Sequence, residues 1–473
     1  MKADLSRSTF RAKRHYSRVV QQQGRPLLDA DWNEQVAILH HGLRLLAGDL
    51  TGSDKGRAGA PVGVAGFEVN ALEGKGDDFS IGHGRYYVDG LCCECDEDTT
   101  FAGQPLRSRT RIDRGGISLI YLDAWESVVT AVDDPALLEP ALSGADTAVR
   151  ARVNWQVRAH RLSERHDPNA PDHDALREES AEVERRLRSH PRGLLRARLA
   201  EPHAEAGRRP GHGAQAARFR GPENLLYRVE VHKGGPAGEA TFKWSRDNGA
   251  TLLPLAALEG SIAQVAASAR RAAAALPAGT WLEVCDRDGR TLAHAEPMVQ
   301  ARSTGGPSER GRIDLAPAPP NHLQFQPGQR TDVALRRWDQ RSDPERGGEA
   351  AGPDGVPIVE GERDAHWLPI EDGIQIQFVA GDKHAHHYQP GDYWLIPART
   401  ADDGMLLRSK EPHAPDGVDH HYAPLALFVP QKAAVIADYR QWFRPLAALQ
   451  DQVMALSDTL DDLVKRVAKL EGH

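Results

Sequence analysis

The chain has 473 residues, which is too many for one hydrophobic core and predicts roughly two to four domains. Its formal net charge of −8 at pH 7 excludes a general electrostatic attraction to nucleic acids or to anionic lipids. Aromatic residues make up only 6% of the chain, whereas its 44 glycines and 31 prolines predict a body rich in strands and loops.

Residues 1–56 predict an extended arm followed by a helix. Apolar residues from Val36 to Leu50 recur at helical spacing, and Asp29 or Asp31 just before them can cap the helix. Paired carboxylates also occur in acid–base catalysis, but helix capping explains these two more simply. We expect this segment to dock on a neighbouring protein through residues around the start of the helix: Arg25, Asp29, Asp31, Trp32 and Asn33.

Neither a secretory signal nor a membrane span is predicted. The first residues contain no apolar segment of the signal-peptide type, and no run of about 18 apolar residues occurs in the sequence. We therefore expect synthesis in the cytoplasm.

Residues 57–157 predict a β domain. The segment 84–90 alternates apolar and polar residues and ends in an Asp-Gly pair, which is a hairpin signal, and residues 117–122 predict a core strand. Three of the four cysteines fall in one predicted strand: Cys92, Cys93 and Cys95. Because a zinc site needs two separated ligand pairs, we interpret all four cysteines as free, partly buried thiols.

Residues 158–220 predict a charged insertion that is partly disordered, with one amphipathic helix around residues 175–187. The arginines of this insertion could form a site for a polyanion. Acidic residues are interspersed among them, however, which favours an ordinary solvated face.

Residues 221–432 predict one or more further β domains, with an Ala-rich helix near 255–275. Residues 433–473 predict the C-terminal helix and coiled coil, in a helical region that begins near Gln431 and is interrupted at Pro445. The predicted fold class is therefore mainly β and multidomain (α+β), with a sandwich-like or barrel-like body between an N-terminal arm and helix and a C-terminal coiled coil.

The C-terminal helix carries apolar side chains at alternating spacings of four and three, which is the pattern of a coiled-coil seam. This seam consists of Leu449, Val453, Leu456, Leu460, Leu463, Val467 and Leu470. A single helix of this length cannot bury such a stripe alone, so we expect self-association. An amphipathic helix packed on its own domain is the alternative interpretation.

The number of strands in the coiled coil is suggested by polar residues beside the seam. Arg466 at position g and Glu471 at position e can pair across parallel helices, and their stems cover the apolar layers. The pattern resembles a trimerisation motif, and Val464 at another e position widens the apolar face. These features favour three strands over two.

Six longer blocks occur in order along the chain: residues 22–35, 121–126, 224–232, 241–249, 391–399 and 420–427. Together they resemble a bacterial family of uncharacterised proteins whose genes lie beside baseplate, sheath and tube genes of phage-tail-like contractile injection systems. The hairpin at residues 86–90 also resembles phage tail-fibre and baseplate adaptor domains. The resemblance provides no catalytic motif, and it implies a structural or adaptor component of the particle.

Three hypotheses for the function follow. In the first, the chain is a non-enzymatic structural subunit, a baseplate component or fibre or spike adaptor, that forms a homotrimer and contacts other baseplate, spike or fibre proteins. It would need no cofactor, would not bind nucleic acid, and would act within the assembled particle, including particles released from the cell. The alternatives are a receptor- or carbohydrate-binding tail-fibre module and a metal-dependent envelope hydrolase.

Two sets of residues bear on the alternatives. His384 and His386 would share a strand face, and with His420 or His421 they could form a three-His metal site. Structural or surface histidines are the simpler interpretation, so we assign no metal. Five tryptophans could form sugar-stacking platforms, although packing inside or between domains is favoured for each: Trp32, Trp125, Trp244, Trp338 and Trp394.

Overall fold

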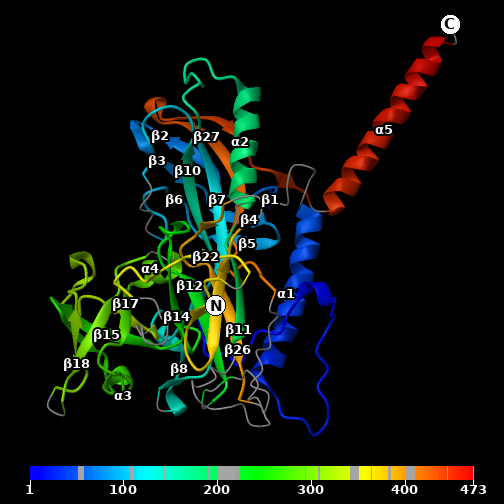
Figure 1. Cartoon of the computed structure of the whole chain (residues 1–473). Coiled ribbons are helices and arrows are strands. Elements are labelled where there is room, and N and C mark those ends of the chain that lie inside the picture. The colour runs from blue at the N-terminus through cyan, green and yellow to red at the C-terminus, as the bar shows by residue number, and fades with distance from the viewer. Residues whose placement is uncertain are drawn as a thin grey trace. The chain divides into compact units, whose positions relative to one another are not determined.

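A computed structural model describes the conformation of residues 1–51, 58–106, 111–142, 144–189, 192–200, 219, 221, 223–292, 295–306, 309–340, 351–363, 365–381, 385–400, 411–444 and 446–471. This part of the chain is mainly β, with several sheets, a closed barrel of six strands, and helices near both ends of the chain (Figure 1). The predicted fold class is confirmed.

The chain divides into two compact units, and each unit joins segments that are distant in the sequence. The first unit comprises Met1–Ile38, Glu126–Arg152 and Ser189–Asp419. The second unit comprises Leu39–Trp125, Val153–Arg188 and His420–His473. Helix α1 (Asp29–Thr51) and strands β7 (Ser118–Val129) and β10 (Arg150–Arg161) carry the chain from one unit to the other.

Two sheets of the first unit share one hydrophobic core. One has the order β11-β24-β22 with β23 also paired to β24, and the other has the order β21-β14-β12-β26. Alternating β-branched and aromatic residues place side chains such as Val229, Phe242, Phe378 and Trp394 in the shared core. The bounds are β11 Leu194–Leu199, β12 Leu225–Val231, β14 Thr241–Ser245, β21 Val356–Pro357, β22 Glu360–Gly361, β23 Leu368–Pro369, β24 Ile374–Val379 and β26 Tyr393–Ala398.

The barrel also belongs to the first unit and closes in the order β15-β16-β19-β18-β17-β20. Its interior is filled by aliphatic residues and Phe325, so the inside of the barrel is a packed core. The bounds are β15 Leu252–Glu259, β16 Ile262–Val265, β17 Trp281–Cys285, β18 Val299–Thr304, β19 Arg312–Ala316 and β20 Ala334–Trp338. Shorter elements of this unit are β8 Leu138–Glu139, β9 Ala145–Asp146, β13 Gly235–Pro236, α3 Arg270–Ala274, α4 Arg287–Leu292 and β25 His387–Tyr388.

The second unit is built on three sheets with the orders β29-β1-β4-β5, β10-β7-β27-β28 and β2-β3-β6. Their inward residues form a common core, and helix α2 (His173–Arg188) packs Leu176 and Val183 against β27. The remaining bounds are β1 Ala58–Pro61, β2 Val69–Leu72, β3 Lys75–Ile81, β4 Gly84–Val88, β5 Leu91–Cys95, β6 Thr99–Thr100, β27 His421–Val429, β28 Ala434–Asp438, β29 Trp442–Phe443 and α5 Leu446–Glu471.

The predicted Asp-Gly hairpin is confirmed as β4 and β5. Asp89 and Gly90 both adopt positive φ, at 48° and 82°, as a tight two-residue turn requires. A Cβ on Gly90 would lie 2.2 Å from the carbonyl oxygen of Arg44, so only glycine permits the close contact between this turn and α1. The predicted helix around residues 175–187 is also confirmed, as α2.

Two segments that the sequence analysis predicted as helical or irregular are strands in the structure. Most of the Ala-rich stretch near 255–275 is the hairpin β15–β16, with Gly260 at φ 57° in its turn, and only Arg270–Ala274 is α-helical. Alternate burial along β15 outweighs the helix propensity of alanine there. Residues 194–199 of the charged insertion form β11, in full register with β24; residues 201–218 lie outside the described part of the chain.

The C-terminal helix begins at Leu446 and not near Gln431. Residues Ala434–Asp438 form β28, which pairs with β27 at the edge of a sheet. This short apolar run fits either a helix or a strand by its pattern alone, and the adjacent strand decides the outcome.

Candidate self-association and docking surfaces

Helix α5 leaves the predicted coiled-coil seam exposed. Leu449, Val453, Leu456, Leu460, Leu463 and Val467 are each between 44% and 69% exposed. Leu470 and Glu471 belong to the helix, but their side chains lie outside the described part of the structure. Arg466 is exposed. Its pairing with Glu471 of a neighbouring helix stays a prediction.

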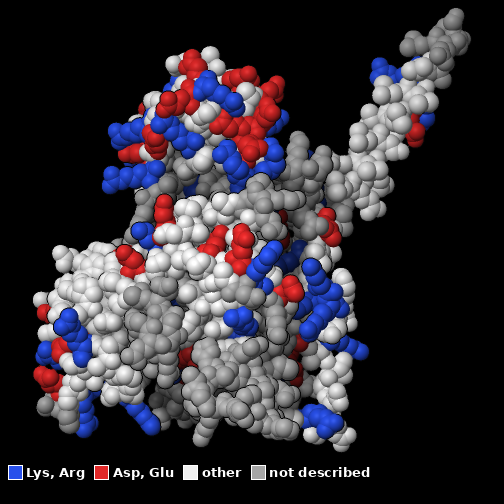
Figure 2. All heavy atoms as spheres, in the orientation of Figure 1, with Lys and Arg blue, Asp and Glu red and all other residues white. Residues whose placement is uncertain are grey.

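The exposed surface of α5 carries few charged side chains on the face that Figure 2 shows. Val464, which lies beside the seam, is 60% exposed and widens the apolar stripe. A helix with its apolar stripe in water loses the burial that normally stabilises an amphipathic helix. The arrangement is typical of a helix whose partner is another molecule.

Helix α1 presents a second exposed apolar stripe, which we call the α1 stripe. It consists of Trp32, Val36, Leu39, Leu43, Leu46 and Leu50, all of them exposed. Their spacings again alternate four and three, as in a coiled-coil seam. The buried residues of α1 are smaller on average than those of the α1 stripe: Ala30, Ile38, Gly48 and Thr51. The helix therefore turns its largest apolar side chains away from its own chain.

The N-terminal arm is held along the first half of α1 by hydrogen bonds. The backbone N–H of Ser6 donates to Asp29 Oδ2 at 2.9 Å, and Thr9 Oγ1 donates to Glu34 Oε2 at 2.7 Å. The backbone N–H of Val19 donates to Gln35 Oε1 at 2.7 Å. Burial opposes ionisation of Asp29, but the hydrogen bonds from Ser6 outweigh it and lower the pKa of this carboxyl.

Of the predicted docking residues, Arg25, Asp29, Trp32 and Asn33 are exposed and Asp31 is half-buried. Trp32 is 71% exposed, so the packing interpretation is wrong for this tryptophan within the chain. The other four tryptophans are buried, as predicted: Trp125, Trp244, Trp338 and Trp394. The four cysteines are free thiols, also as predicted, and burial raises the pKa of Cys93.

Three of the four candidate metal-ligating histidines, His386, His420 and His421, each contact a carboxylate. In the first unit, His386 Nδ1 lies 2.8 Å from Glu360 Oε1; His384 falls outside the described residues. In the second unit, His420 Nδ1 lies 2.7 Å from Asp123 and His421 Nδ1 lies 3.0 Å from Asp89. Within the described ranges, no group of three or more His, Cys, Asp or Glu side chains is arranged to hold a metal ion.

The contacts of His420 and His421 connect sequence blocks that are 297 and 332 residues apart. His420 stacks on Trp125 with ring centroids 5.1 Å apart, and Asp123 also pairs with Arg158 at 2.9 Å. Beside them, Arg188 lies 2.7 Å from Asp89. Burial opposes ionisation of Asp89, but the hydrogen bond with His421 and the charge of Arg188 outweigh it and lower its pKa. The contacts join β7 to β27 and the β4–β5 turn to α2.

A cluster of buried charges in the first unit was not predicted. We call it the buried ion cluster; it consists of Lys2, Arg228, Glu230, Lys243, Glu283 and Arg336. Glu230 contacts Arg228 at 2.5 Å and Lys2 at 2.8 Å, and Lys243 contacts Glu283 at 2.7 Å. The alternation of Arg228 and Glu230 in a strand places them on one face, but it does not indicate that this face is buried.

None of the helices in the described part of the chain is both long and apolar enough to cross a membrane. No curated protein and no solved structure matches the chain significantly. A model of a family of unknown function, DUF6519, matches residues 1–183 and 183–428, and the match ends before α5. Because the two matches together span most of the sequence, the chain belongs to this family of unknown function.

Proposed function

We propose that the chain is a structural subunit of a phage-tail-like contractile injection particle and that it self-associates through α5. Within the particle it would act as a baseplate component or as an adaptor for a fibre or spike. The exposed α5 seam carries the proposal of self-association. The particle is proposed from the resemblance of the six sequence blocks to proteins encoded beside baseplate, sheath and tube genes.

The energetics of α5 favour association. Fully burying one Leu or Val side chain contributes about 1.5–3 kcal/mol, so a seam of this length holds enough apolar surface to join parallel helices. The cost of association reduces this gain, but several buried layers exceed it. Valine at two of the a positions with leucine at the d positions is compatible with two parallel helices. The apolar Val464 at an e position and the spacing of Arg466 and Glu471 carry the preference for three helices.

The α1 stripe provides a second contact surface. Its heptad spacing fits a helix of a neighbouring subunit or of another particle protein. The positions beside the stripe include Asn33, His40, Gly42 and Ala47, which are small or uncharged and allow a helix to approach closely. The exposed Trp32 and Arg25 at the start of α1 would extend this contact onto the neighbour.

Paired variants test self-association. Leu456→Asp with Leu463→Asp places two acids in the α5 seam, and Met454→Asp with Ala455→Asp places two acids on the same helix outside it. We expect the seam variant to be a monomer by light scattering and the control variant to keep the mass of the unmodified protein. Equal masses for the two variants, whether both associated or both monomeric, would contradict the assignment of the seam.

The position in the particle is tested by cryo-electron microscopy of intact particles that contain this chain. We expect density for its barrel and sheets at the baseplate or at the base of a fibre or spike. Density elsewhere, or particles that assemble fully without the chain, would contradict the particle part of the proposal and leave self-association to be judged by the variants.

A further inference from the structure

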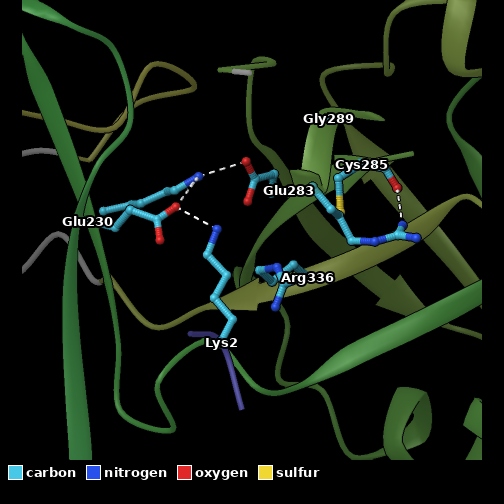
Figure 3. A pocket seen from close by; sticks show the side chains of 8 residues that line it. Lys2, Glu230, Glu283, Cys285, Gly289 and Arg336 are labelled. Atoms are coloured by element: carbon cyan, nitrogen blue, oxygen red, sulfur yellow. Dashed lines mark hydrogen bonds and ion pairs between the residues drawn. The ribbon is translucent and has the colours of Figure 1, made fainter. Parts of the chain in front are cut away.

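A small polar pocket lies inside the first unit, next to the buried ion cluster (Figure 3). Strands β12, β14, β17 and β20 contribute its walls, and Lys2 reaches into it from the N-terminal arm. The lining residues are Lys2, Glu230, Lys243, Glu283, Cys285, Gly289, Arg290 and Arg336. The pocket has room for a single occupant not much larger than a water molecule.

Each carboxylate oxygen of the pocket already has a hydrogen-bond donor within the chain. One oxygen of Glu230 accepts from Arg228 at 2.5 Å and the other lies 2.8 Å from Lys2. Glu283 accepts from Lys243 Nζ at 2.7 Å and from Trp338 Nε1 at 2.9 Å. Figure 3 shows Lys2 reaching toward Glu230, with Glu283 on the same side of the pocket. Each of the four carboxylate oxygens therefore already accepts from one donor, and no other carboxylate among the described residues lines the pocket.

The donors of the pocket are in excess. Lysine and arginine side chains only donate hydrogen bonds. Arg336 donates to the carbonyl oxygen of Gly249, and no carboxylate in the described part of the chain pairs with it. Arg290 Nε is buried without a hydrogen-bond partner among the described residues. Buried donors without acceptors are costly, so the pocket favours an occupant that accepts hydrogen bonds.

The charge of the cluster is also unbalanced. Lys2, Arg228, Lys243 and Arg336 carry four positive charges against the two negative charges of Glu230 and Glu283. Arg290 lies outside this count because it pairs with Asp133. Burial lowers the pKa of Lys2 to about 8, and the charges of Arg336 and Arg228 add to this lowering while Glu230 opposes it. A water molecule would accept hydrogen bonds but would leave the positive charge uncompensated.

We infer that the pocket binds one small inorganic monovalent anion of halide size, with chloride as the occupant in ordinary buffers. The anion accepts hydrogen bonds from Lys2, Lys243 and Arg336 and compensates part of their charge. It thereby fastens the N-terminal arm to the junction between the barrel and the β12–β14 pair. This site is independent of self-association through α5.

The direct test is the anomalous scattering of bromide in crystals of the intact protein grown with bromide in place of chloride. We expect one anomalous peak inside the pocket, in contact with the Lys2, Lys243 and Arg336 nitrogens. A pocket without an anomalous peak, occupied by water alone, would overturn the inference. This test needs no variant and so does not depend on a mutated cluster folding.

A second test compares melting temperatures in chloride and in gluconate at the same ionic strength. A tenfold excess of chloride over its Kd should raise the melting temperature of the unmodified protein by roughly 2–4 °C. Arg336→Met should lose this rise, whereas Arg302→Met, on the exposed side of β18, should keep it. No rise in the unmodified protein, or the same rise in both variants, would overturn the inference.

Discussion

Helices α2 and α5 lie in the same unit of the protein, yet they place their apolar residues in opposite environments. α2 buries Leu176 and Val183 in a cluster with Leu427 and Val429 of β27, while its outer residues form surface ion pairs such as Glu182–Arg185. Mixed charges cover this region in Figure 2, whereas the visible face of α5 is largely uncharged. α2 therefore buries its apolar residues within its own chain, whereas those of α5 stay exposed, which fits the proposal that α5 packs against another molecule.

The same substitution in both helices would show this contrast most strongly. Leu176→Ala removes a fully buried side chain and should lower the free energy of unfolding by about 2–5 kcal/mol. Leu460→Ala removes a side chain that is 62% exposed and should leave the unfolding of a monomeric protein within about 0.5 kcal/mol. Denaturant unfolding in the background of the seam variant Leu456→Asp with Leu463→Asp measures both. Similar losses at the two positions would remove the distinction between the helices.

The buried carboxylates of the strand body find their charge partners within the chain, and the pH dependence of stability should reveal this. Burial favours the neutral form of Glu283, but the charges of Lys243 and Lys2 outweigh it and lower its pKa to about 2. Because the folded pKa is below the unfolded value, the stabilisation is complete above about pH 4.5 and is lost as the pH falls toward 2. Glu283→Gln should therefore cost about 3 kcal/mol at pH 7 and progressively less below pH 4.5.

Unfolding curves of the unmodified protein and of Glu283→Gln between pH 7 and pH 3 check this prediction. The difference between the two proteins should narrow as the solution is acidified. A constant difference across this range would mean that the carboxylate of Glu283 contributes no charge-dependent stability, and that its contacts with Lys243 and Trp338 act through packing alone.

A smaller effect is expected at Gly42, in the exposed half of α1. A Cβ built on this glycine meets no atom within 4 Å. Since glycine inside a helix is less stable than alanine by roughly 0.5–1 kcal/mol, Gly42→Ala should raise the free energy of unfolding of a monomeric background by this amount. A loss of stability would show that this part of α1 packs closely on its own chain.

The smallest change in stability is expected in the α1 stripe itself. Leu43→Glu with Leu46→Glu replaces two exposed side chains by residues of good helix propensity and should change the free energy of unfolding by less than about 0.5 kcal/mol. The same variant should weaken incorporation of the chain into particles if α1 docks on a neighbour. A large destabilisation of the free protein would indicate that the stripe is part of its core.

Periodic patterns in the sequence predicted the elements that depend on local residues. The heptad at the C-terminus, the Asp89-Gly90 hairpin and α2 all follow from spacing or turn chemistry that neighbouring residues determine. The segments 255–265 and 434–438 were misassigned because alanine-rich or short apolar runs fit both helix and strand. Their conformation is decided by β20, β19 and β27, which lie elsewhere in the sequence.

The exposed α1 stripe and the buried ion cluster also could not be predicted from local sequence patterns. The apolar residues of α1 are visible in the sequence, but only the structure shows that they face away from the chain. The buried ion cluster combines residue 2 with positions between 228 and 336, and no local pattern connects them. Likewise, the contact between Asp123 and His420 depends on the pairing of β7 with β27.

In the proposed assembly, α5 packs against the α5 helices of other copies of the chain. The most direct measurement is the molar mass of the intact protein by light scattering over a range of micromolar concentrations. We expect a mass near three times that of the 51.8 kDa chain, decreasing only on strong dilution. A mass of one chain throughout this range would contradict it, because the α5 seam would then stay in water without a partner of its own kind.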